Sequence, residues 1–143
     1  MKLNQIVFST LIVFLFCGTL FSQKQEAKKV IVKVLSFNIL HGKTTNGSFN
    51  LNTIANVIKK ADADFVSLQE VDFKTNRAKK YDLPTELGYR TKMTSIFGRA
   101  MYYDGGEYGE AILSKYSFLS TRNVALPFSE LNEPRAALEI TTV

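Results

Sequence analysis

Two apolar segments with an amphipathic helix between them are the feature of this sequence that most limits its fold. Val30–Phe37 is a nearly continuous, β-branched apolar run, typical of a strand covered on both faces. A second apolar strand opens at Asp64, and Asn50 or Asn52 can cap the helix that precedes it. The apolar residues of that helix are Leu51, Ile54, Ala55, Val57, Ile58 and Ala61. This order predicts two parallel strands joined by a right-handed crossover.

A polar side chain stands at the tip of each of these strands. Asn38 follows the first apolar run, and Glu70 follows the second. In open α/β sheets the crevice beyond the carboxyl ends of the strands is where ligands bind. Considered alone, Glu70 is explained equally well as a solvent-exposed residue at the end of a strand. Asn38 alone is explained as a residue that caps a loop by bonding to nearby backbone. As a pair of oxygen ligands they predict a site for a hard divalent cation, Mg²⁺ or Mn²⁺.

The rest of the chain predicts one more helix and a series of strands. A short helix is expected near Leu83–Leu87, with Pro84 in its first turn and Gly88 just past its end. Mixed apolar and polar runs separated by turn residues then predict strands at Thr94–Tyr103, Tyr108–Ser114, Phe118–Leu126 and Arg135–Val143. The pattern indicates an α/β protein.

The first 22 residues have the composition of a targeting segment. One lysine precedes an apolar run from residue 6 to residue 21, which is shorter than the ~20 residues of a spanning helix. We expect 1–22 to be a signal peptide, 23–29 a flexible lead and 30–143 a domain, which makes the protein secreted or periplasmic. Membrane anchoring is the alternative, either through an uncleaved apolar segment or through a lipid on Cys17, the only cysteine.

The charge of the chain gives little information about its partners. The formal net charge is +5, which suits an anionic substrate but is also ordinary for a soluble surface. A basic cluster follows the second strand, at Lys74, Arg77, Lys79 and Lys80. Such a cluster can steer a polyanion or simply be a solvated face. No aromatic residues alternate with it in the sequence, which disfavours base stacking and a dedicated nuclease.

Four segments together resemble the endonuclease/exonuclease/phosphatase superfamily of deoxyribonuclease-like hydrolases. They are Ser36–Gly42, Leu68–Asp72, Gly106–Lys115 and Glu133–Arg135, in the family's order. The resemblance implies a four-layer α/β sandwich of two packed β-sheets flanked by helices. It also implies metal-dependent cleavage of phosphate esters, with Glu70 as the metal-binding glutamate and Asn38 beside it, holding the ion or the attacked phosphate.

The same resemblance offers three catalytic candidates. His41, the only histidine, follows the first motif closely and would touch the substrate phosphate or its leaving group. Tyr108 and Arg135 carry a phenol and a guanidinium able to reach a phosphate oxygen. Each has a structural alternative: an idle turn histidine, a packing tyrosine, and an arginine paired with Glu133 or Glu139. Glu110 stands where the family pattern has asparagine or a small residue, so its role is open.

Two later family motifs, an Asp-x-Asn and a final Asp-His pair, have no counterpart in this sequence. The resemblance therefore implies an incomplete fold, the N-terminal half of a larger hydrolase, which alone would not turn over substrate. The expected substrate is a phosphate ester: a phospholipid headgroup, a nucleic acid, or a sugar or inositol phosphate. No obligate protein partner and no transmembrane span are expected. The alternative is a non-catalytic module that binds a phosphate ligand with the same fold.

Overall fold

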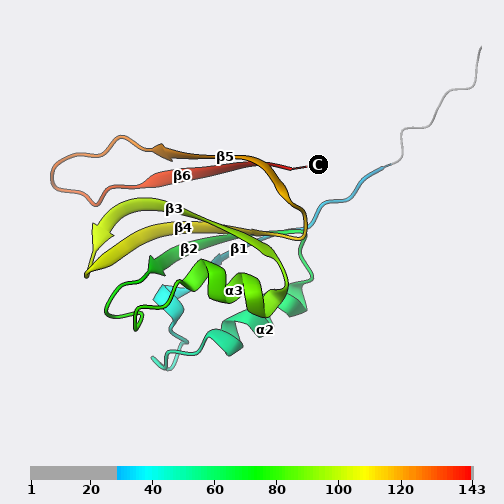
Figure 1. Ribbon diagram of the computed structural model, residues 1–143, viewed down its shortest axis with the longest axis horizontal. Coiled ribbons are helices and arrows are strands. Elements are labelled where there is room, and N and C mark those ends of the chain that lie inside the picture. The colour runs from blue at the N-terminus through cyan, green and yellow to red at the C-terminus, as the bar shows by residue number, and fades with distance from the viewer. Residues whose placement is uncertain (1–28, 143) are drawn as a thin grey trace, which may run out of the picture. The chain divides into compact units, whose positions relative to one another are not determined.

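The β structure is divided between a four-stranded sheet and a two-stranded sheet (Figure 1). The computed structural model describes residues 29–142, so the predicted signal peptide and all but the last residue of the predicted lead lie outside the described residues. By its contacts the chain divides into two units, Met1–Ile31 and Val32–Val143, and every described helix and strand belongs to the second.

The four-stranded sheet has the order β1-β2-β4-β3. β1 (Val34–Asn38) runs parallel to β2 (Phe65–Phe73), as predicted, with Asn38 opposite Gln69. β4 (Gly106–Ser114) pairs antiparallel with β2 on one side and with β3 (Thr94–Tyr103) on the other. The bounds of β3 are those predicted from the sequence, because the Asp-Gly turn after Tyr103 ends the strand.

The prediction that the first strand spans Val30–Phe37 and is covered on both faces is wrong. β1 begins only at Val34 and forms an edge of the sheet. Its residues alternate, with Leu35 and Phe37 packed against the core while Val34 is 67% exposed. β1 is an edge strand, with a neighbouring strand on one side only. The apolar run is therefore longer than the part of it that the sheet covers.

The second sheet pairs β5 (Phe118–Ala125) antiparallel with β6 (Ala136–Thr142) and packs against β3 and β4. A side-chain bond joins the two sheets, since the Asn123 amide donates to the Arg99 carbonyl at 2.8 Å. The backbones approach closely at Gly98, where an added Cβ would lie 3.1 Å from the Leu138 Cβ.

Two helices cover the other face of the four-stranded sheet (Figure 1). α2 (Leu51–Ala61) begins at Asn50, whose side chain accepts a hydrogen bond from the Thr53 amide at 3.1 Å. α3 (Leu83–Thr91) begins in the same way at Asp82, which accepts from the Thr85 amide at 3.0 Å. A short 3₁₀ turn, η1 (Leu40–Gly42), follows β1.

The predicted end of the second helix at Gly88 is wrong. α3 continues to Thr91 and ends at Lys92, which has the left-handed conformation common after helix C-termini. Gly88 lies inside the helix, where an added Cβ would be 2.9 Å from the Met93 carbonyl oxygen. Its lack of a side chain therefore serves close packing of α3 against the start of β3.

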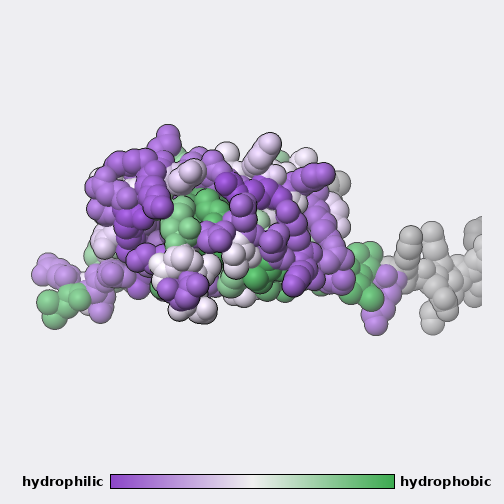
Figure 2. Space-filling view, turned by 90° about the horizontal axis from the view of Figure 1, so that it is seen from below, coloured by the Kyte–Doolittle hydropathy of each residue, from purple (hydrophilic) through white to green (hydrophobic). Residues whose placement is uncertain are grey.

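The hydrophobic core lies between the helices and the four-stranded sheet. Its buried members include Ile54, Ile58, Val66, Leu68, Leu87 and Leu113. The helix-bearing face is mostly hydrophilic at its surface, with smaller hydrophobic areas between the polar groups (Figure 2). Helices, one sheet and a second sheet make three successive layers of the expected sandwich, which confirms the α/β two-sheet fold class. No helix in residues 29–142 has the length and apolar character needed to cross a membrane.

Two residues of α2 give a matched test of this packing. Ile54 is 3% exposed in the core, whereas Val57 on the same helix is 44% exposed. We expect Ile54→Ala to lower the free energy of unfolding by ~2–5 kcal/mol through lost burial and a cavity. Val57→Ala should change it by less than ~1 kcal/mol. Urea unfolding followed by circular dichroism measures both, and equal effects would contradict this placement of the core.

Candidate functional site

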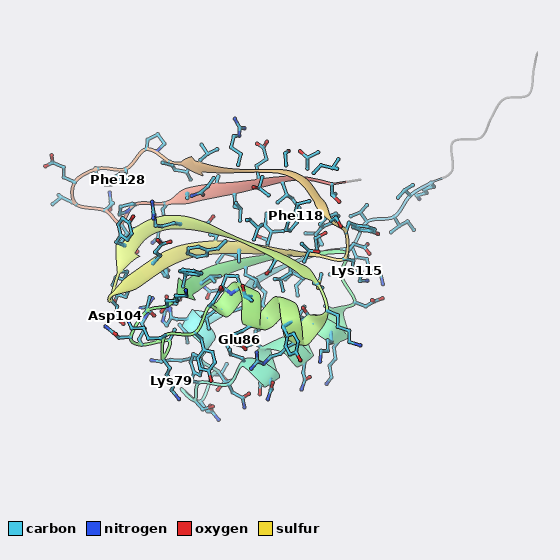
Figure 3. The ribbon with its side chains drawn as sticks, in the orientation of Figure 1. Lys79, Glu86, Asp104, Lys115, Phe118 and Phe128 are labelled. Atoms are coloured by element: carbon cyan, nitrogen blue, oxygen red, sulfur yellow. The ribbon has the colours of Figure 1, made fainter. Side chains whose placement is uncertain are left out.

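A cavity of about 480 Å³ lies at the end of the sheet where β1, β2 and β3 finish and β4 begins. Its wall includes every sequence-predicted site residue: Asn38, Glu70, His41, Tyr108 and Arg135. Figure 3 shows Asp104 and Phe128, from the β3–β4 turn and the β5–β6 loop, at this end of the sheets. Lys115 and Phe118 lie at the opposite end. The topology thus gathers residues from positions 38 to 135 around one hollow.

Asn38 and Glu70 converge, as the sequence predicted. The Asn38 amide nitrogen donates a hydrogen bond to the Glu70 Oε1 at 2.8 Å. The Asn38 Oδ1 accepts from the Leu40 backbone amide at 2.9 Å, so the amide group is oriented with its nitrogen toward the carboxylate. Asn38 therefore bridges the backbone after β1 and the acid of β2, and it holds that acid in place.

The expectation that Glu70 stands at the tip of its strand is wrong. β2 continues to Phe73, and Glu70 occupies a bulge between Leu68 and Val71, with φ of +56°. The bulge has a packing reason, since Val66, Leu68 and Val71 all belong to the core although their spacing changes from two residues to three. With regular alternation Glu70 would point into that core. The extra residue turns its carboxylate to the cavity instead.

His41 lies beside the carboxylate without bonding to it. The distance from its Nδ1 to Glu70 Oε2 is 3.6 Å, which is too long for a hydrogen bond. The Nδ1 is buried and has no partner among the described residues. Burial lowers the pKa of His41 below 6.5, and the positive charge of Arg77 lowers that pKa further. His41 is thus a neutral imidazole with one unused ring nitrogen.

Tyr108 and Arg135 meet on the other side of the cavity. Tyr108 is 8% exposed on β4, and its ring centroid lies 6.5 Å from that of His41. Burial raises the pKa of Tyr108, while a hydrogen bond with Arg135 acts in the opposite direction. Arg135 also donates to Glu133 Oε2 at 2.8 Å, the ion pair that the sequence offered as its structural alternative. Arg135 therefore forms its structural ion pair while it lines the cavity.

Sequence reasoning missed an ion pair in the cavity wall. Asp72 is fully buried and accepts two hydrogen bonds from Arg77, Nε to Oδ2 at 2.7 Å and Nη2 to Oδ1 at 2.8 Å. The sequence pattern places Arg77 in a basic cluster with three lysines. The available signal was an aspartate inside an apolar strand, since a buried carboxylate needs a nearby cation or hydrogen-bond donors.

Glu110 is a further acid in the cavity wall, beside Glu70 and Glu133. It lies on β4, opposite Gly98 of β3. Burial raises the pKa of Glu110, because it disfavours the charged form of the carboxyl group.

The oxygen ligands in the cavity suit a hard cation that takes most of its ligands from water and from a substrate phosphate. No set of three or more His, Cys, Asp or Glu side chains able to hold a metal ion occurs in the described part of the chain. Glu70 has one carboxylate oxygen free of hydrogen bonds, and Asn38 supports the other. One carboxylate with several waters and a substrate phosphate is the way proteins commonly bind Mg²⁺. The residues thus fit such an ion.

The described residues thus form an α/β fold of two packed sheets, with an acid, an amide and an imidazole gathered at one end. The model of the Endonuclease/Exonuclease/phosphatase family matches residues 35–142, so this chain belongs to that family. The resemblance seen in the sequence motifs is confirmed. A search of curated proteins finds no significant match.

Solved structures share this fold at low sequence identity. An endonuclease/exonuclease/phosphatase from Beutenbergia cavernae has a TM-score of 0.61 at 20% identity, covering 78% of this chain and 34% of its own. A family protein from Leptotrichia buccalis has a TM-score of 0.62 at 15% identity, covering 79% and 49%. ANGEL2, a 2′,3′-cyclic phosphatase, has a TM-score of 0.50 at 22% identity, covering 80% and 40%. The chain spans a third to a half of the length of these structures.

The pKa of His41 can be measured directly, because it is the only histidine in the chain. We expect proton NMR of its imidazole in EDTA to give a pKa below 6.5 in the folded protein and near 6.5 in urea. The cause is burial, supplemented by Arg77. A folded pKa equal to or above the unfolded value would contradict the buried, unpartnered imidazole.

The same shift fixes the sign of a stability effect. Since the unfolded chain binds a proton more tightly at His41, the free energy of unfolding should fall as pH drops from about 6.5 through the lower folded pKa. His41→Asn should flatten this part of the pH profile, as measured by urea unfolding at each pH. A free energy of unfolding that increases as pH drops through this interval, in the wild type but not in His41→Asn, would contradict the lowered pKa.

Proposed function

We propose that this chain provides the metal-binding and phosphate-binding side of a phosphoester hydrolase dependent on Mg²⁺ or Mn²⁺. The observation that carries the proposal is the Glu70 carboxylate, aimed into the cavity by a bulge and held there by the Asn38 amide at 2.8 Å. Membership of the family supports hydrolysis of a phosphate ester, either a phosphodiester or a phosphomonoester.

Glu70 would hold the cation, and Asn38 would fix the direction of the carboxylate. A bound divalent ion neutralises the negative charge that develops on the phosphoryl oxygens during hydrolysis. Asn38 is neutral and donates to Glu70, so the acid keeps its negative charge for the ion. The amide also prevents rotation of the carboxylate, because its own oxygen is bonded to the backbone of Leu40.

The remaining side chains of the cavity suit contact with an anionic ester. Arg135 supplies a positive charge and Tyr108 a phenol, and both side chains line the cavity. Burial favours the neutral form of His41, so its imidazole would contact the substrate phosphate or its leaving group without adding a positive charge. Tyr108 and Arg135 would each reach a phosphate oxygen.

The substrate class extends to phospholipid headgroups, nucleic acids and sugar or inositol phosphates. A solved neighbour named as a 2′,3′-cyclic phosphatase supports phosphate esters in general. The N-terminal apolar run supports export as a secreted or periplasmic protein, with membrane anchoring as the alternative. The second candidate is a module with the same fold that binds a phosphate ligand without cleaving it.

Metal binding tests the proposal most directly. We expect the full chain to bind Mn²⁺, as followed by electron paramagnetic resonance. Glu70→Gln should weaken this binding by more than about tenfold, and Asn38→Ala by about tenfold, because the loss of a supporting partner alone has that effect. Glu139→Gln is the matched control, since Glu139 lies on β6 and pairs with Arg122 outside the cavity. Equal affinity in Glu70→Gln and the control would refute the site.

Hydrolysis separates the enzyme from the binding module. The full chain is incubated with Mn²⁺ and a nucleic acid, a phospholipid or a sugar phosphate, and released phosphate or cleaved product is measured. Turnover that disappears in Glu70→Gln and persists in Glu139→Gln indicates the enzyme. Binding of phosphate without turnover, lost in Glu70→Gln, indicates the non-catalytic module and the need for further groups to activate water.

A further inference from the structure

Arg77 is held in place at several points by hydrogen bonds. Its side chain donates two hydrogen bonds to the fully buried Asp72, which also accepts from the Thr75 hydroxyl at 2.5 Å. The backbone amide of Arg77 donates to Asp104 Oδ2 at 2.7 Å. The residue is thus fixed at both its main chain and its guanidinium group.

Two aromatic rings complete this placement. The central carbon of the Arg77 guanidinium lies 4.4 Å from the ring centroid of Tyr103 and 5.4 Å from that of Tyr108. Contacts of this kind favour a guanidinium held over the ring faces. Tyr103, Tyr108 and Arg77 all line the same cavity as Glu70.

The geometry leaves part of the guanidinium unused. A guanidinium has five N–H donors, and Asp72 takes two of those of Arg77. The other three donate to no residue in the described part of the chain, and 28% of the side chain is exposed. Burying a carboxylate to hold an arginine contributes little net stability compared with apolar packing. The exposed donors on the cavity wall are what distinguishes this pair from a purely structural one.

We propose that Arg77 binds an anionic phosphoryl oxygen of the substrate through these free donors, with Asp72 and Thr75 as its positioning residues. This rests on the proposed function, because Glu70 and its cation would hold the same phosphoryl group from the other side. A planar guanidinium matches the oxygens of a phosphate better than a lysine ammonium does. The ligand class is therefore a phosphate ester, whichever alcohol it carries.

Arg99 provides a matched control for this proposal. It also pairs with a carboxylate, Glu107 at 2.9 Å, and its guanidinium lies 4.2 Å from the ring centroid of Tyr102. Unlike Arg77, it does not line the cavity. Each of the two arginines thus has its own acid partner and its own aromatic neighbour. They differ in access to the site.

The test measures binding of inorganic phosphate to the full chain by isothermal titration, with Mn²⁺ and again in EDTA. The Asp72→Asn/Arg77→Met double variant removes the guanidinium without leaving a buried unpaired charge. We expect its phosphate affinity to fall at least about tenfold, the loss of one charge-assisted hydrogen bond. Its Mn²⁺ affinity should be unchanged, a result that general damage to the site would not give. Arg99→Met should match the wild type in both.

Arg77→Lys keeps the test decisive if the double variant does not fold. It retains the charge beside Asp72 but lacks the planar fork, so phosphate affinity should fall several-fold with Mn²⁺ affinity intact. Phosphate affinity equal to that of the wild type in a folded Arg77 variant would overturn the proposal. Phosphate binding that depends on Arg77 in EDTA, together with a Mn²⁺ affinity that is unchanged in Glu70→Gln, would support Arg77 while refuting the metal site, so the two failures are distinguishable.

Discussion

The spacing of three core residues in β2 determines where the site can form. Val66, Leu68 and Val71 must all face the helices, and a strand alternates every second residue, so one extra residue has to leave the ladder. That residue is Glu70, and its left-handed φ is the local cost of keeping the core closed. The same packing that stabilises the fold therefore turns an acid toward the cavity. No separate loop is needed to present it.

A second irregularity on β3 matches the first. β3 carries its own extra residue between Arg99 and Met101, opposite the same Gly109 of β4 that faces Val71. Gly109 allows the close approach, because an added Cβ there would lie 2.0 Å from the Gly98 carbonyl oxygen. Bulges bend strands and increase their twist. With one on each side of β4 at the same level, the sheet end is hollowed around Glu110 instead of being filled by regular side chains.

Local sequence patterns predicted the helices and strands well. They predicted the exposure and the contacts of these elements less well. β3 and the parallel pair of β1 and β2 followed from local patterns, since turn residues and periodicity are encoded nearby. The exposure of Val34 did not, because edge position depends on which strands pair elsewhere in the chain. The pairing of Asp72 with Arg77 could have been predicted from the sequence. The bulge could also have been predicted, because the spacing of the apolar residues changes from two to three before Val71. The approach of Tyr108 to His41 could not be predicted from the sequence, because it depends on the fold.

Two acids on β2, two positions apart, have opposite electrostatic environments. Asp72 is fully buried, and a guanidinium compensates its charge through two hydrogen bonds. Glu70 is partly exposed, and its one hydrogen-bond donor is the neutral amide of Asn38. The neighbouring His41 does not compensate it either, since burial favours the neutral imidazole. The cavity thus has a negative charge that is oriented but not neutralised, next to a wall that carries the Arg77 guanidinium. Under the proposed function, a cation held by Glu70 would balance this negative charge, and the three free donors of Arg77 would be available to an anion in the same cavity.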